Sequence, residues 1–154
     1  MRREDKQVED FNAIEEIINS AQVCRVAMVK DNQPYVVPLC FGYENKVVYF
    51  HCADQGKKID VLKSNPKVCV EFDIDTQLVM SERACSFEMN YRSVIGFGKA
   101  LLLKDLHEKK IALDIMLKKY TGKSFNIPED GLKKVTVIKI ILEEITGKIS
   151  GYEK

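Results

Sequence analysis

The chain has 154 residues, 45% hydrophobic and 31% charged, with a formal net charge of +1. The length favours a single domain over 1-154. The small net charge excludes a general nucleic-acid binder, which needs a strong basic excess. Its longest apolar runs fall far short of the roughly 18 residues that cross a bilayer, so we expect no membrane contact. The opening MRREDKQVED is charged throughout and shows no signal peptide, so we expect a cytoplasmic protein whose residues 1-10 form a mobile lead-in.

The first predicted elements are a helix and three strands. Apolar residues at helical spacing predict a helix over 11-21, with Asp10 or Asn12 as its N-cap. Strands are predicted over 23-30, 35-43 and 47-52, because turn-forming residues separate these apolar runs. The short connections favour an antiparallel meander of the three strands.

The second half of the chain predicts two more helices and further strands. A short helix over 57-64 ends at Asn65-Pro66, and a strand over 67-73 follows. The polar segment 74-83 is not assigned, while 84-90 and 92-103 are expected to form a strand pair. Asp105 and Glu108 predict a capped helix that runs to Tyr120, and a last strand is expected over 134-145. Six or seven antiparallel strands with three helices indicate a mainly β protein, a small closed barrel.

Two lysines occupy an unusual position in this pattern. Lys57 and Lys58 open the helix over 57-64, where the helix dipole disfavours positive side chains. A bound phosphate would explain them, because free backbone N–H groups, two ammonium groups and the small Gly56 together make an anion cradle. The alternative is that both side chains point into water, as most lysines do. The residues alone leave both interpretations open.

A few other residues could contribute to a site. Tyr91-Arg92-Ser93 offers a guanidinium that can grip a phosphate through two hydrogen bonds, although such a residue can equally be a surface arginine. His51 adjoins the loop that contains Gly56, and only His107, far along the chain, could join it as a ligand. We therefore expect no metal site. No Ser-His-Asp triad or carboxylate pair is recognisable, so nothing indicates a hydrolase.

The five cysteines are odd in number and form no C-x-x-C pair, which disfavours a zinc ribbon or a redox dithiol. We expect them to be reduced and mostly buried. Cys52 is the one beside the unusual loop.

Several short segments carry a family resemblance through their order and spacing. They are MRR (1-3), CRVAM (24-28), QPYVVPL (33-39), FGY (41-43), YFH (49-51), GKK (56-58), NP (65-66), YRSVIGFGKA (91-100), TGK (146-148) and GY (151-152). Together they resemble the FMN-binding split-barrel family, with the fold of pyridoxamine 5'-phosphate oxidase, and within it the nitroimidazole-reductase (Nim-type) branch. The resemblance covers essentially the whole chain.

This resemblance implies an antiparallel split β-barrel of the FMN-binding type, with flanking helices, that forms a homodimer and holds its flavin in the subunit interface. Gly56-Lys57-Lys58 would bind the flavin phosphate, and Val37-Pro38-Leu39 would run along the isoalloxazine ring. His51-Cys52 would lie between ring and phosphate, and Tyr91-Arg92-Ser93 would contact FMN as well.

One departure from the family pattern bears on the substrate. Pyridoxamine-phosphate oxidases carry an Arg and a Lys on the strand that matches 35-43, and these places here hold Val37 and Gly42. Vitamin B6 oxidation is therefore not expected, and reduction of nitroaromatic or other small electron acceptors matches better. The flavin would supply the chemistry. His51 would be a proton donor or substrate contact, or alternatively a purely structural contact to FMN.

A reduced nicotinamide or another donor would bind transiently, because no Gly-rich dinucleotide fingerprint is present. The alternative function is a non-catalytic flavin- or haem-binding protein, with His51 as an axial ligand of the haem. A small nucleic-acid-binding barrel is disfavoured, because the exposed aromatic pattern of such barrels is missing.

Overall fold

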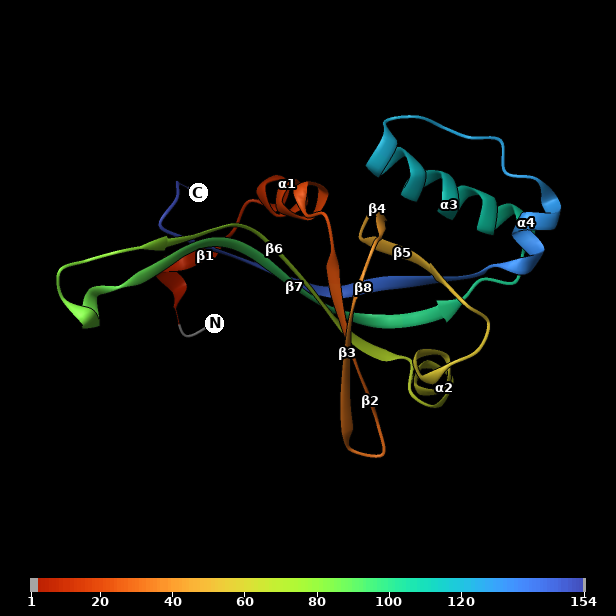
Figure 1. Cartoon of the computed structure of the whole chain (residues 1–154), viewed down its shortest axis with the longest axis horizontal. Coiled ribbons are helices and arrows are strands. Elements are labelled where there is room, and N and C mark those ends of the chain that lie inside the picture. Colours follow the sequence, from red (N-terminus) through yellow and green to blue (C-terminus); the bar gives the residue numbers. More distant parts are fainter. Residues whose placement is uncertain (1–2, 154) are drawn as a thin grey trace.

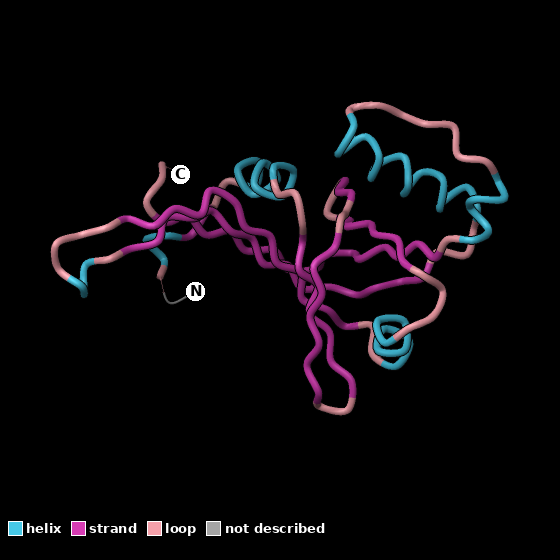
Figure 2. The backbone as a smooth tube through the Cα atoms, viewed as in Figure 1, coloured by secondary structure: helices cyan, strands magenta, loops and turns pink. Residues whose placement is uncertain are grey.

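Eight strands form one antiparallel sheet in the computed structural model, which describes residues 3-153 (Figures 1 and 2). The strand order is β3-β2-β6-β7-β8-β5-β4, and β1 pairs with β8 off this path. The strands are β1 Gln7–Val8, β2 Cys24–Lys30, β3 Gln33–Leu39, β4 Gly42–Glu44, β5 Val47–Cys52, β6 Lys67–Val79, β7 Glu88–Leu102 and β8 Thr136–Ser150. The predicted mainly β, antiparallel class is confirmed. Met1 and Arg2 of the first family segment lie outside the described residues.

Helices cover different parts of this sheet (Figure 1). They are α1 Phe11–Ser20, α2 Lys57–Ser64, α3 Leu106–Thr121 and α4 Glu129–Lys134, with single 3-10 turns at η1 Glu4–Lys6 and η2 Ala84–Ser86. α1 packs on β6 and β7, α3 packs on β4, β5 and β8, and α2 contacts β2. Within residues 3-153, none of these helices has the length and hydrophobicity that crossing a bilayer requires.

The predicted caps and turns fix the ends of several elements. Asp10 accepts a hydrogen bond from the N–H of Asn12 at 3.0 Å and so caps α1. Asp105 accepts one from the N–H of Glu108 at 2.9 Å and caps α3. Gly122 ends α3 with a φ of 70°, the left-handed conformation that glycine adopts without strain. These local signals were sufficient to locate α1 and α3.

The two antiparallel pairings of the predicted meander are present, but its middle strand over 35-43 is not continuous. β3 ends at Leu39, and the chain continues through Cys40 and Phe41 into the separate strand β4. β3 pairs with β2, β4 pairs with β5, and β2 takes β6 as its second neighbour. The physical reason is the buried Phe41, whose ring packs edge-on against Phe72 at 5.0 Å and so anchors the break inside the core.

The segment 74-103 also differs from the prediction. Instead of a pair formed by 84-90 and 92-103, β7 is one strand that pairs with β6 along its length and with β8. β6 continues to Val79, past a bulge between Ile74 and Gln77, so the two strands extend as a long arm beyond α1 (Figure 2). The last strand is likewise longer than predicted.

Two further elements were not predicted at the chain's ends. Gln7 and Val8, expected in a mobile lead-in, pair with Lys148 and Gly147 of β8, and Val8 is buried. The short α4 precedes β8 and buries Leu132. Both elements depend on contacts with distant parts of the chain.

Candidate functional site

The amino end of α2 is open. Its N-cap is Gly56, with a φ of 123° and no side-chain cap. A methyl group at Gly56 would meet nothing within 4 Å, so there is open space beside this helix end. The N–H groups of the first helical turn have no partner inside a helix, and here no side chain satisfies them. An anion would find both donors and room at this position.

The two lysines at this helix end lie over aromatic rings of two different strands. Lys57 Nζ lies 4.6 Å from the ring centroid of Tyr35 on β3. Lys58 Nζ lies 5.2 Å from the ring centroid of Phe50 on β5. These cation–π contacts hold the ammonium groups near the sheet, whereas the alternative interpretation has both side chains extended into water. They also show that α2 closes the space between β3 and β5.

Cys52 is the last residue of β5, the strand whose Phe50 contacts Lys58. Its thiol is partly buried, and this burial raises the pKa of Cys52, although the nearby Lys58 ammonium opposes the shift. A thiol with a raised pKa stays protonated near neutral pH and is a poor nucleophile. Cys52 can therefore pack or donate a weak hydrogen bond here, but it does not supply a thiolate.

β3 offers an open backbone edge next to α2. It is the first strand in the order of the sheet, so its outer edge has no strand partner among residues 3-153. Val37 and Leu39 are partly buried against the core, while Pro38 between them is exposed. Unpaired N–H and C=O groups at an edge can bind the polar rim of a planar ligand. The predicted set Val37-Pro38-Leu39 thus lies on the strand that Lys57 touches.

His51 faces a different space from its neighbour Cys52. It is exposed and lines a cavity of about 310 Å³ between β5 and α3. The other lining residues are Cys40, Leu113, Met116, Leu117, Tyr120 and Ile127. The Tyr120 hydroxyl is fixed, because it accepts the Phe41 N–H at 2.9 Å and donates to the Gln22 carbonyl at 2.8 Å. This cavity can take a small apolar molecule beside one imidazole.

The segment Tyr91-Arg92-Ser93 lies on β7, far from the two lysines of α2. Arg92 pairs with Ile74 of β6, whereas Lys67, which follows α2 closely, pairs with Lys99. At about 3.3 Å per residue, Arg92 is about 23 Å further along β7 than Lys99. One chain therefore does not bring this segment to the lysines, and its contact with a flavin remains a prediction that needs a second copy.

Sequence reasoning missed the partners of the predicted residues. Tyr35 and Phe50, which position the lysines, and the α3 wall beside His51 come from segments distant in sequence. A weak signal existed for Tyr35, because it stands inside the segment QPYVVPL. Neither His residue takes part in a metal cluster, and residues 3-153 hold no group of three ligating side chains suited to a metal.

Comparison with known proteins places this architecture in a family. The profile of the family described as pyridoxamine 5'-phosphate oxidase matches residues 10–149. A candidate 5-nitroimidazole antibiotic resistance protein from Bacteroides thetaiotaomicron is 37% identical in a match that covers 93% of this chain and 86% of that one, with a TM-score of 0.84. A FAD-binding protein from Mesorhizobium loti is 26% identical, with 95% and 98% covered and a TM-score of 0.70.

An uncharacterized protein from Rhizobium meliloti is 33% identical over 55 residues, a match that spans only 36% of that relative's length and 36% of this chain. The profile match and the Bacteroides structure both extend over nearly the whole sheet described above. The chain therefore belongs to the pyridoxamine 5'-phosphate oxidase family, as a split-barrel member similar to the Bacteroides 5-nitroimidazole resistance protein.

Proposed function

We propose that this protein is an FMN-dependent oxidoreductase that works as a homodimer and reduces small electron acceptors such as nitroaromatics. The observation that carries the proposal is the open amino end of α2, flanked by Lys57 and Lys58. Two ammonium groups and a set of free N–H donors suit the terminal phosphate of FMN. The name of the Mesorhizobium relative, a FAD-binding protein, supports a flavin in this fold.

FMN is proposed rather than FAD, because the sequence offers no Gly-rich motif for a dinucleotide. The open space at Gly56 supports the binding of a phosphate there. The exposed edge of β3 at Pro38 would receive the rim of the isoalloxazine ring. Bound FMN would supply the redox chemistry, and the residues of the chain would orient the ring and admit the acceptor.

His51 is the residue proposed to move a proton. Its imidazole lines the largely apolar cavity beside α3, where a small acceptor can bind. Imidazole can donate a proton near neutral pH, which suits the protonation of an acceptor that gains electrons. Leu113, Met116 and Leu117 would favour a flat apolar molecule over a charged one.

A second copy would complete the site, and the sheet has a surface suited to it. Val36, Ala27, Cys69 and Phe97 are cross-strand neighbours on β3, β2, β6 and β7 and form one row, which we call the outer-face row. Val36 is 59% and Phe97 51% exposed, and Ile95 and Leu101 extend the apolar surface along β7. This apolar row is bordered by charged residues such as Lys67, Lys99 and Glu71, as the core of an interface is by its rim, and we propose that the two copies meet here.

The experiment has two stages. Ligand released by heat from the protein as purified is identified by mass spectrometry, and the absorbance spectrum separates flavin from haem. FMN is expected, and FAD, haem or a protein that stays empty after flavin reconstitution would refute the cofactor proposal. The loaded protein is then mixed anaerobically with reduced nicotinamides and a panel of nitroaromatic compounds.

The role of His51 has a matched control on α3. His51→Gln should slow the reduction of the acceptor at least about tenfold without lowering FMN affinity, whereas His107→Gln, at another exposed histidine, should change neither. Equal effects of the two variants would remove His51 from the mechanism. Tight FMN binding without turnover of any acceptor would leave a flavin-binding protein rather than an oxidoreductase.

A further inference from the structure

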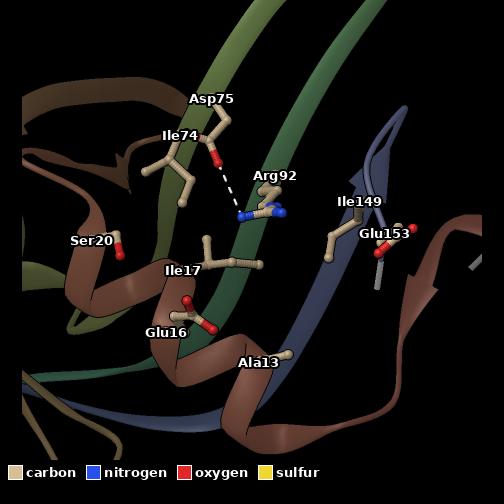
Figure 3. Close-up of a pocket in the computed structure, with 9 residues that line it drawn as sticks. All are labelled: Ala13, Glu16, Ile17, Ser20, Ile74, Asp75, Arg92, Ile149 and Glu153. Atoms are coloured by element: carbon tan, nitrogen blue, oxygen red, sulfur yellow. Dashed lines mark ion pairs between the residues drawn. The ribbon is translucent and has the colours of Figure 1, made fainter.

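A cavity of about 470 Å³ lies between α1 and the sheet, away from the α2 cradle (Figure 3). One stripe of α1 forms one wall, and β6, β7, β8 and the C-terminal segment form the others. Its apolar lining residues are Ala13, Ile17, Ile74 and Ile149, and its polar ones are Glu16, Ser20, Asp75, Arg92 and Glu153. Its volume lies within the range of small-molecule sites.

Arg92 is the central polar group and has an unused donor edge. Its Nη1 lies 3.2 Å from Asp75 Oδ2, the ion pair drawn in Figure 3. Its Nε is the one buried side-chain nitrogen or oxygen within residues 3-153 that lacks a hydrogen-bond partner. An unmet buried donor is costly, and native structures rarely keep one without a reason. The Arg92 side chain as a whole is 32% exposed, so its guanidinium can offer an accessible nitrogen to a carboxylate in the cavity.

The guanidinium is held in place from two sides. The Tyr152 ring lies 5.1 Å from Arg92 Cζ, and the Tyr152 hydroxyl donates to the Asp75 carbonyl at 2.8 Å. Asp75 itself has a φ of 55° and stands in the bulge of β6. A bulge re-aims a side chain, and a non-glycine residue in this conformation needs support from its surroundings. The chain thus uses a strained position to fix the orientation of Arg92.

The charge of the cavity restricts its ligand. Three exposed carboxylates (Glu16, Asp75 and Glu153) and one guanidinium line the cavity, so a simple anion is disfavoured despite Arg92, although solvent screens the repulsion. These carboxylates do not form a group that could hold a metal ion. A ligand with one carboxylate and one ammonium group satisfies both signs of charge.

We propose that this cavity binds a small α-amino acid with an apolar side chain. Its carboxylate accepts a hydrogen bond from the guanidinium of Arg92, and its ammonium group pairs with Glu16 and Glu153. Its side chain packs on Ile17, Ile74 and Ile149. This site is separate from the proposed flavin cradle, because Arg92 lies on the part of β7 farther from α2.

Titration calorimetry with the flavin-loaded protein tests the proposal, with L-leucine as the probe. Two analogues each remove one charge: 4-methylpentanoate lacks the ammonium group and leucine amide lacks the carboxylate. We expect leucine to bind at least about tenfold tighter than either analogue. No detectable heat or NMR shift with millimolar leucine, or an analogue that binds as tightly as leucine, would overturn the proposal.

Variants assign the contacts to residues. Arg92→Gln and, as an independent variant on the exposed face of α1, Glu16→Gln should each weaken leucine binding at least about tenfold. Arg83→Gln, at an exposed arginine of the loop before β7, is the matched control and should bind leucine normally. FMN affinity should be unchanged in Glu16→Gln and Arg83→Gln. If Glu16→Gln weakens FMN as much as leucine, the cavity belongs to the flavin site, and a separate amino-acid site is refuted.

Discussion

Replacing Lys57 and Lys58 together with alanine separates a phosphate cradle from a pair of ordinary surface lysines. In the structure each ammonium group contacts one aromatic ring, Tyr35 or Phe50. A cation–π contact at a partly exposed site contributes about 0.5–1 kcal/mol to stability. Removing two positive charges from a helix amino end returns a few tenths of a kcal/mol. The double variant should therefore lose only about 1 kcal/mol of its free energy of unfolding.

The expected loss of flavin affinity is much larger. A hydrogen bond to a charged group contributes about 1.5–3 kcal/mol, which corresponds to about a tenfold to hundredfold change in affinity for each effective contact. With two lysines on one phosphate, the dissociation constant of FMN should rise about a hundredfold or more. Fluorescence titration measures this constant, and urea denaturation of the apoprotein measures the stability.

Two controls make the result specific. Riboflavin lacks the phosphate, so its weaker binding should barely change in the double variant. Lys63→Ala/Lys104→Ala removes the same formal charge from exposed positions outside the amino end of α2 and should bind FMN normally. Equal losses of affinity for FMN and riboflavin would mean that the lysines support the ring site or the fold, and the cradle would be refuted.

Three other predictions concern packing, association and thiol chemistry. Gly98→Ala should destabilise the protein by about 3 kcal/mol in urea denaturation, because its methyl group would overlap a backbone oxygen of β8, whereas Gly131→Ala, at an open helix position, should not destabilise it. Phe97→Glu should yield a monomer in light scattering. Ile111→Glu, at a similarly exposed apolar residue of α3, is the control and should remain a dimer. A dimeric Phe97→Glu would refute the outer-face row as the interface. Burial raises the pKa of Cys24 to about 12, so iodoacetamide at pH 8 should leave this thiol unlabelled until the chain unfolds; rapid labelling in the native state would contradict its burial.

The sequence predicted elements well where the signal is local. Asp10, Asp105 and Gly122 act through hydrogen bonds and backbone angles within a few residues, so α1 and α3 could be located from their caps. The arm formed by β6 and β7 lacked such a signal. Leu78, Val79 and Met89 are all exposed, so no alternation of buried apolar and exposed polar residues marks the strands. Pairing between the two strands defines the arm.

In the candidate site, too, local features were predictable from the sequence and long-range contacts were not. The lysines at 57 and 58 were identifiable, because a charge that opposes the helix dipole is a local anomaly. The rings that hold them come from β3 and β5, and this proximity follows from the strand order. The side of β7 on which Arg92 lies could not be predicted either, because this strand is apolar on both faces. Val94 is buried, while the adjacent Ile95 is 40% exposed.

A strand that is apolar on both faces usually has both faces covered, and one chain covers only one face of β7. The outer-face row ends at Val36 on β3, and the opposite face of the same strand carries Tyr35, which contacts Lys57. A second copy on the row would therefore fix the strand that borders the cradle, so flavin binding and association should be linked. FMN should shift Phe97→Glu towards the dimer in analytical ultracentrifugation, and its affinity for FMN should rise with protein concentration. If the monomeric variant binds FMN as tightly as the native protein at every concentration, the flavin lies within one chain and the shared site is refuted.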